Sequence, residues 1–470
     1  MEPAEFAEYA EYVSRERILF MSNDMTRGKP LPIIIRLALP MLLGALFQQI
    51  YQLTDMYIIG NVINSRALAS VGVANTVVFP FTIVVTGLTT GITATISRYF
   101  GAKDPVMLRK SLMGAVYITL FCAIIFSVAG IFGAEPMLRL LNTPDDIIRD
   151  AVLYLQIVVG GSAGIIIYYA ASAILWAVGD SRTPLIFLIV TSILNILLDL
   201  LFIWVLGMGV VSAAIALVLS QFTVAIIISV YVYKYFGLSQ FAKNDFLSSC
   251  QAIWSILKIG LPVAMQNMLL SVGDMVIVRV VNSYGTNVVA AYTTGNRIVL
   301  LFMNFISYFT MAHAIYAGQN LGAKEPERLR DGFIKTAGLT VALSALIGLL
   351  IYLTGGAWAR LFIAETDQHI DAIVSLTQQL LRVHSLFMVV LGMLYLYCNT
   401  LRGMGFVGMP FLSGICEMTV KVGLVYILTR LFGHTGLWYI YPIGWMLGLL
   451  PPMIWYHLGR WERSMNPLSK

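Results

Sequence analysis

The chain alternates between long apolar stretches and short polar breaks. Each stretch is about twenty residues or longer, enough to cross the roughly 30 Å hydrocarbon core of a bilayer as an α-helix. The breaks carry Gly, Pro or charged residues. This pattern predicts an all-α membrane protein with twelve transmembrane helices. They are expected at residues 33–62, 67–96, 111–133, 149–178, 184–206, 209–236, 252–281, 287–318, 332–354, 370–401, 408–431 and 435–459.

Composition supports a polytopic membrane protein. Hydrophobic residues occupy 59% of the 470 positions and charged residues only 11%, whereas an ordinary soluble domain has about 25% charged residues. The mean hydropathy is +0.82. The net charge is +6, but the basic residues are spread over short loops. This spread argues against a nucleic-acid partner, and the lipid bilayer is the expected surrounding.

The loops on the two sides of the membrane differ in charge. With twelve spans, 20 of the 30 Lys and Arg residues fall on one side and 7 on the other. Because loops rich in Lys and Arg stay in the cytoplasm, both termini are predicted to be cytoplasmic. The expected location is the plasma membrane, which is the inner membrane of a bacterium.

The second half of the chain repeats the first. GAKDPVMLR at 101–109 returns as GAKEPERLR at 322–330, Leu39-Pro40 returns as Leu261-Pro262, and LWAVGDSRTP at 175–184 resembles LRGMGFVGMP at 401–410. The shared order predicts two pseudo-symmetric six-helix bundles that face the same way, related by an axis along the membrane normal. The expected parts are an N-terminal segment (1–30), an N-lobe (31–236), a linker (237–251), a C-lobe (252–460) and a tail (461–470).

Two predicted helices carry carboxylates inside their apolar stretches. In the first, Gln48, Gln52 and Asp55 are spaced i, i+4, i+7 and share one face. In the fifth, Asn195 and Asp199 lie one turn apart. Lipid offers these groups no hydrogen bonds, so both faces are expected to point into the bundle. A carboxylate in a membrane span is costly, and we therefore expect Asp55 and Asp199 to be functional.

Other polar positions in the spans have a structural alternative. Asn267, Ser271 and Asp274 repeat the spacing of the first helix in the seventh. Asp274, however, lies near a span end and near Arg279, where it could be solvated or paired. A stripe of threonines that begins at Asn75 in the second span is expected to form hydrogen bonds between packed helices.

Further motifs point to no catalytic chemistry. Glu417 and Lys421 are spaced i, i+4 and are expected to neutralise one another. Pro40 could act as a hinge in the first helix, although static kinks are commoner. The sequence contains no Walker A loop, no HExxH motif and no cysteine pair with metal-ligand spacing. We therefore expect neither an enzyme nor ATP-driven transport.

Several segments together resemble one transporter family. LALPMLLGALFQQIYQLTDMYIIGNVI, ALASVGVANTVVFPF, LNILLDLLFI and the duplicated GAK(D/E)P loops are similar to the multidrug and toxic compound extrusion (MATE) family of the MOP superfamily. The resemblance runs from about residue 30 to 460. It implies two six-helix lobes around a central cavity and export of organic cations, driven by inward H⁺ or Na⁺.

The resemblance also assigns roles to residues. The cation-coupling site falls on Asp55, Asn195 and Asp199, with H⁺ or Na⁺ as the coupling ion and no cofactor. Some members carry an acid in the middle of helix seven, where this chain reads PVAMQNMLLSVGD, so a second ion site would need Asp274 as a substitute. Pro40 is the expected hinge, and the transporter is expected to be a monomer. Candidates for the substrate cavity are Gln48, Gln52, Asn75, Asn267, Asp274, Tyr292 and Asn296.

Two alternative functions remain at the level of sequence. A lipid-linked saccharide flippase of the same superfamily would be expected to carry more basic residues in its spans and often two extra helices. This chain has only Arg36, Arg382 and Lys421 there. A channel is disfavoured because the sequence shows two lobes without a symmetric ring or filter motif.

Overall fold

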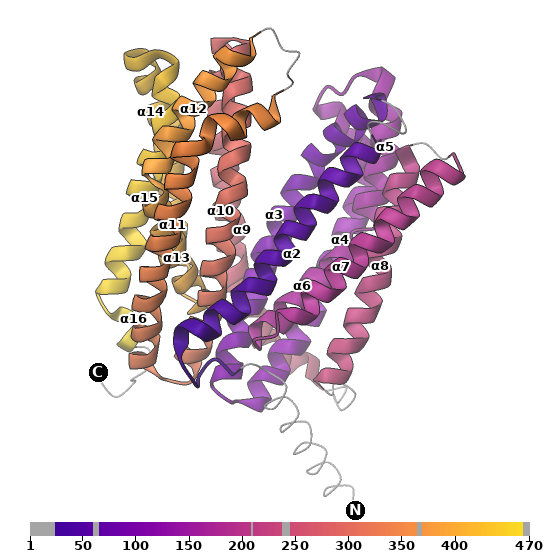
Figure 1. The fold of residues 1–470 in the computed structure, drawn as a ribbon. Coiled ribbons are helices and arrows are strands. Elements are labelled where there is room, and N and C mark those ends of the chain that lie inside the picture. Colours follow the sequence, from indigo (N-terminus) through magenta and orange to yellow (C-terminus); the bar gives the residue numbers. More distant parts are fainter. Residues whose placement is uncertain (1–23, 60–64, 208–209, 237–244, 364–368, 464–470) are drawn as a thin grey trace, which may run out of the picture. The chain divides into compact units, whose positions relative to one another are not determined.

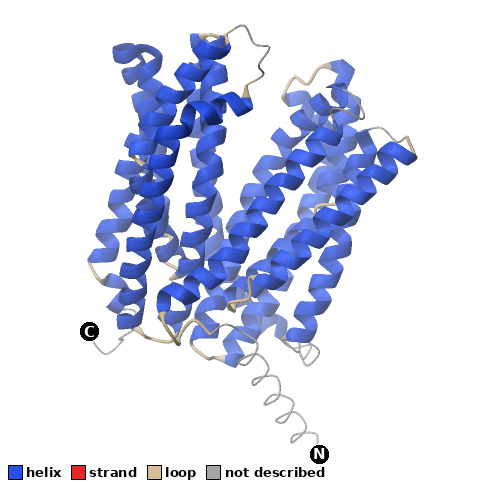
Figure 2. Cartoon of the chain, viewed as in Figure 1, coloured by secondary structure: helices blue, strands red, loops and turns tan. Residues whose placement is uncertain are grey.

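A computed structural model of the protein describes residues 24–59, 65–207, 210–236, 245–363 and 369–463. Throughout these ranges the regular elements are helices (Figure 2). Parts of the predicted N-terminal segment (1–30), linker (237–251) and tail (461–470) lie outside the described residues, namely 1–23, 237–244 and 464–470. The first half of the chain forms α2 (Pro30–Ile58), α3 (Ser65–Gly101), α4 (Pro105–Leu140), α5 (Asp145–Gly160), α6 (Ala163–Ala177), α7 (Arg182–Asp199) with the π-helix η2 (Leu200–Val205), and α8 (Val210–Tyr235) (Figure 1). The second half forms α9 (Asp245–Val281), η4 (Asn282–Tyr284), α10 (Thr286–Gly322), α11 (Pro326–Phe362), α12 (Ile370–Leu386), α13 (Met388–Gly403), α14 (Gly408–Phe432), η5 (Gly433–Tyr439), α15 (Ile440–His457) and α16 (Arg460–Arg463).

The described helices confirm an all-α membrane protein. Ten helical stretches are long and apolar enough to cross a membrane, or eleven when the bent pair of α12 and α13 counts as one span. One of the ten, Gly408–His457, has 50 residues, which is about 75 Å of helix and far exceeds one crossing. It contains α14 and α15, which pack against one another. When these two helices count separately, the twelve predicted crossings are all accounted for.

The described residues divide into two compact units. Unit 1 contains Leu39–Leu261, and unit 2 contains Thr26–Ala38 and the chain from Pro262 onward. Both boundaries fall at the repeated Leu-Pro pairs, within α2 and within α9. Each unit has apolar cores of its own: Ile92, Ile174 and Ile228 are buried in unit 1, and Ile298 and Leu380 in unit 2.

The sequence repeat is also a structural repeat. Lys103 after α3 and Lys324 after α10 both adopt left-handed backbone, with φ of 53° and 59°. Each donates its backbone N–H at 3.1 Å to the carbonyl three residues earlier. Gly179 after α6 and Gly405 after α13 match in the same way, with φ of 88° and 86°. Because glycine reaches this region without a steric penalty, the repeated glycines fix how these helices end.

Two predicted spans are broken helices, which the hydropathy pattern did not predict. The fourth span is divided into α5 and α6 around Gly161, and the tenth bends by 53° between α12 and α13 at Phe387. Both stretches remain continuously apolar because the chain changes direction at the break while the residues on either side stay in an apolar environment. Hydropathy alone therefore cannot locate such a break.

Candidate functional site

The two carboxyl groups singled out in the sequence meet inside unit 1. Asp55 lies in the last turns of α2, and Asp199 is the last residue of α7, just before η2. Their side chains are in hydrogen-bonding contact. Asp199 is fully buried, and its Oδ1 has no hydrogen-bond partner among the described residues. The contact places two acids side by side in a low-dielectric interior.

Asn195 completes this group. It lies one turn before Asp199 on α7 and is 1% exposed. In the orientation that satisfies both of its ends, the amide nitrogen donates to Asp199 Oδ2 (3.1 Å) and the amide oxygen accepts from the backbone N–H of Leu217 on α8 (3.2 Å). The three residues predicted for cation coupling are therefore brought together by α2 and α7, with α8 holding the amide.

Tyrosines that the sequence reasoning missed surround the carboxyl pair. Tyr51 on α2 and the buried Tyr154 on α5 both interact electrostatically with Asp55 and Asp199. Tyr51 precedes Asp55 by four residues, so its position on the same helix face was a usable signal. Tyr154 offered no such signal, because its closeness depends on how α5 packs.

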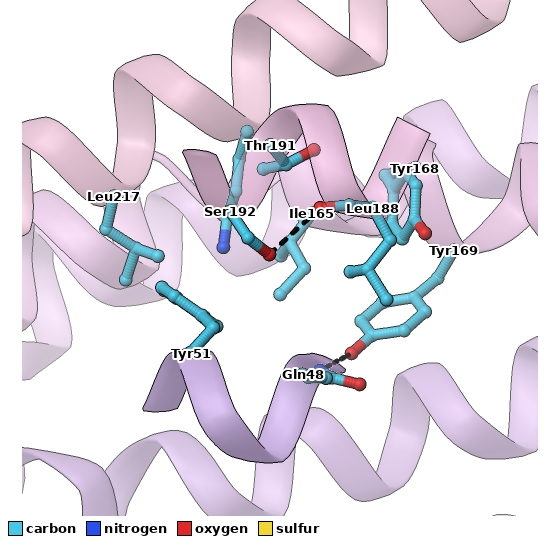
Figure 3. A pocket seen from close by; sticks show the side chains of 10 residues that line it. Gln48, Tyr51, Ile165, Tyr168, Tyr169, Leu188, Thr191, Ser192 and Leu217 are labelled. Atoms are coloured by element: carbon cyan, nitrogen blue, oxygen red, sulfur yellow. Dashed lines mark hydrogen bonds between the residues drawn. The ribbon is translucent and has the colours of Figure 1, made fainter. Parts of the chain in front are cut away.

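A pocket adjoins the carboxyl pair and shares Tyr51 with it. Side chains from α2, α6, α7 and α8 line it, and they are mostly apolar or aromatic (Figure 3). Gln48 reaches across from α2, where its Nε2 donates to the Tyr169 hydroxyl at 2.9 Å (Figure 3). Ser192 donates back to its own helix, to the Leu188 carbonyl at 2.9 Å. The lining residues are Gln48, Tyr51, Ile165, Tyr168, Tyr169, Leu188, Thr191, Ser192, Leu217 and Gln221.

A second polar cluster lies in unit 2. Asp274 on α9 accepts from Lys421 Nζ at 2.6 Å and from the Tyr441 hydroxyl at 2.9 Å. The Tyr441 and Tyr292 hydroxyls lie 3.2 Å apart, and Asn296 also contacts Tyr292. Three of the predicted cavity residues, from α9 and α10, are thus joined through tyrosine hydroxyls.

The expected ion pair of Glu417 with Lys421 is not formed, although the Lys421 charge still acts electrostatically on Glu417. Lys421 forms its ion pair with Asp274, and the described ion pairs include none between Lys421 and Glu417. The reason is space: Lys421 extends from α14 toward α9, where Gly273 leaves room for its stem. Asp274 is likewise paired with Lys421 and not with Arg279.

The remaining candidates are not part of either cluster. Asn75 is exposed on α3, and the Asn267 carbonyl accepts the Ser271 hydroxyl at 2.9 Å within α9. The side chain of Gln52 lies outside the described part of the structure. Pro40 lies inside α2, which continues through it. Most threonines of the α3 stripe bond within their own helix, as when Thr86 donates to the Thr82 carbonyl at 2.9 Å. Thr93 forms the expected bond between helices, to the Ala173 carbonyl of α6 at 3.4 Å.

A metal site of the usual kind is not formed by the described residues. No group of three or more His, Cys, Asp or Glu side chains within the described ranges could hold a metal ion. Asp55 and Asp199 supply two carboxyl groups, and the Asn195 amide donates to one of them, a set that suits a proton or a single monovalent cation.

Comparison with known proteins gives consistent matches along the chain. The MatE family model matches residues 40–201 and 262–427. The "Probable multidrug resistance protein YpnP" of Bacillus subtilis (strain 168) is 29% identical over 448 residues, covering 93% of this chain and 97% of its own. The "Probable multidrug resistance protein NorM" of Thermotoga maritima is 25% identical over 449 residues, covering 92% and 93%.

Solved structures confirm the fold. An outward-facing multidrug resistance MATE family transporter of the MOP superfamily matches with a TM-score of 0.85 at 23% identity, covering 95% of this chain and 99% of that one. A MOP superfamily transporter from Pyrococcus furiosus matches with the same TM-score and identity, covering 94% and 98%. The predicted twelve-helix architecture is therefore that of known structures.

Proposed function

The chain belongs to the MatE family of membrane transporters, and from this premise we propose that it exports organic cations in exchange for inward-moving protons. The contact between the partly buried Asp55 and the fully buried Asp199 carries this proposal. The names of the relatives YpnP and NorM, both multidrug resistance proteins, support the substrate class.

If both carboxyl groups of the pair were ionised they would repel one another, and a bound cation would remove this repulsion. Two full charges about 4 Å apart repel by about 4 kcal/mol at an effective dielectric constant near 20. The described ion pairs give neither Asp55 nor Asp199 a basic partner. A proton shared between the two groups removes the repulsion and supplies the hydrogen that their contact requires. Na⁺ is the alternative that the experiment below distinguishes, and for Asn195 to be a ligand its amide would have to turn its oxygen from the Leu217 N–H toward Asp199.

Exchange follows if substrate and proton compete for the same charge. An organic cation in the adjoining pocket is attracted by the ionised pair, and the rings of Tyr51, Tyr168 and Tyr169 offer faces for its positive charge. Protonation of the pair removes that attraction. The drug is then released, and the proton leaves on the other side of the membrane.

Movement of α2 is the proposed link between proton binding and release. The helix carries Pro40, which has no backbone N–H and therefore removes one backbone hydrogen bond from the interior of α2. Loss of charge at Asp55 would let α2 bend at Pro40 and reshape the pocket.

The surrounding organisation is part of the same proposal. We assign the N-lobe to residues 31–236 and the C-lobe to residues 252–460, joined by a linker at 237–251. Both termini are placed in the cytoplasm, and the transporter acts as a monomer in the plasma membrane.

Ethidium efflux from proteoliposomes tests the proposal. A pH gradient and a Na⁺ gradient are imposed separately on vesicles that contain equal amounts of protein. Concentrative efflux under the pH gradient alone is the expected result. Efflux under the Na⁺ gradient alone would replace the proton by Na⁺, and equilibration without concentration under both would indicate a channel.

A further inference from the structure

The polar cluster of unit 2 supplies its own cation. The Lys421 side chain is 5% exposed, whereas its ion-pair partner Asp274 is 45% exposed. The Lys421 ammonium also lies 4.8 Å from the centroid of the Tyr441 ring, and Tyr441 donates to the same carboxylate oxygen. The ammonium is therefore held by a carboxylate and an aromatic face, which is how proteins bind cationic ligands.

The neighbouring helices are shaped around this lysine. A Cβ atom at Gly273 would lie 2.9 Å from Lys421 Cδ, so glycine leaves room for the stem beside α9. Glu417, one turn earlier on α14, is buried as well, and a Cβ atom at Gly448 would lie 2.8 Å from its Cγ. Residues spaced i, i+4 are neighbours on a helix. The flexible lysine stem therefore has a second carboxylate within reach.

The second carboxylate oxygen of Asp274, Oδ2, is available to another cation. Both of its described hydrogen bonds end on Oδ1, and none of the described residues donates to Oδ2. Along the same helix Met275 and Val278 are exposed apolar side chains. A half-exposed carboxylate beside apolar surface suits a monovalent cation with an apolar body, which gains from both contacts.

We propose that Lys421 is a tethered competitor for a lipophilic organic cation at Asp274. When such a cation binds the carboxylate, the Lys421 ammonium turns to Glu417, so that neither buried charge is left unpaired. The proposal rests on the proposed transport of organic cations, and it adds a substrate contact in unit 2. A site that is free for about one tenth of the time binds its ligand about tenfold more weakly. The tether thus keeps affinity at Asp274 low, which favours release.

Equilibrium binding to the purified full-length protein in nanodiscs tests this inference. Tetraphenylphosphonium is titrated by calorimetry into the wild type, Lys421→Met and Lys421→Arg. Methionine keeps most of the stem but removes the charge, and Arg402 still interacts electrostatically with Glu417. We expect Lys421→Met to lower Kd about tenfold. Lys421→Arg keeps the positive charge, so its Kd should remain near that of the wild type.

The double variant Asp274→Asn, Lys421→Met identifies the site. It removes both charges together, which avoids a buried unpaired lysine, and its Kd should return to the wild-type value or rise above it. An unchanged Kd in Lys421→Met, or a gain that persists in the double variant, would overturn the inference. Lys421→Gln serves as a second charge-free variant with the same expected result if Lys421→Met does not fold.

Failure here can be distinguished from failure of the proposed function. The same titration is repeated with Asp55→Asn and Asp199→Asn added, which removes the carboxyl pair of unit 1. A gain from Lys421→Met in that background supports the tether even if vesicles show no gradient-driven efflux. Efflux without such a gain supports the proposed function and rejects the tether.

Discussion

Asp199 is fully buried, and its Oδ1 lacks a hydrogen-bond partner among the described residues. A carboxylate in that position requires a proton or another cation, whereas an amide requires neither. We therefore expect Asp199→Asn and Asp55→Asn each to reduce ethidium efflux under a pH gradient about tenfold or more. Efflux is measured in proteoliposomes with matched protein content.

Asp150→Asn is the matched control for Asp55→Asn and Asp199→Asn. The substitution is the same, but Asp150 is exposed on α5, so the charge change should leave efflux unchanged. Normal concentrative efflux by the double variant Asp55→Asn, Asp199→Asn would reject the carboxyl pair as the coupling site. Asp274 and Glu417 would then be the acids to examine.

At the scale of elements, the crossing of α3 with α9 depends on glycine. A Cβ atom at Gly91 would lie 2.3 Å from the Ile256 backbone oxygen, and a backbone atom cannot move aside as a flexible side chain can. We expect Gly91→Ala to cost about 1–3 kcal/mol through overpacking and to lower the Tm in detergent. Gly72→Ala on the same helix has nothing within 4 Å of the new Cβ. Its Tm should stay equal or rise slightly because alanine favours helix. Equal Tm values for the two variants would contradict the close crossing.

The proline of α2 belongs to the same scale. Pro40 lies one residue inside unit 1, next to the boundary at Leu39. Alanine would restore a backbone hydrogen bond and stiffen the helix. We expect Pro40→Ala to slow efflux several-fold while the Kd for ethidium stays within about twofold of the wild type. Equal losses of binding and transport would instead assign Pro40 to the pocket and not to a hinge.

At the scale of the whole molecule, the repeat makes a prediction about sidedness. Lys103 and Lys324 occupy matching turns, so an even number of crossings must place both on one side. In a variant without native cysteines, cysteine at either position should react with an impermeant maleimide only from the cytoplasm. Cysteine at Asn142, in the loop between α4 and α5, should react from outside. Labelling of positions 103 and 324 from opposite sides would reject the arrangement.

Local sequence patterns were enough to predict the membrane spans, the repeat and the acids inside the apolar stretches. Hydropathy over about twenty residues and the i, i+4 spacing of polar groups are local properties, and a helix keeps them wherever it packs. For the same reason Asp55 and Asp199 could be recognised as costly groups in apolar surroundings before any contact was known.

Which polar groups meet depends on how the helices pack. Lys421 has Glu417 four residues away but pairs with Asp274, because Gly273 opens a path to α9. Tyr154 lies near the carboxyl pair because of how α5 packs, and no spacing in the sequence predicts this. Such contacts depend on the rotation of helices far apart in the chain and on the space left between them. Neither quantity is encoded in the local pattern of any one helix.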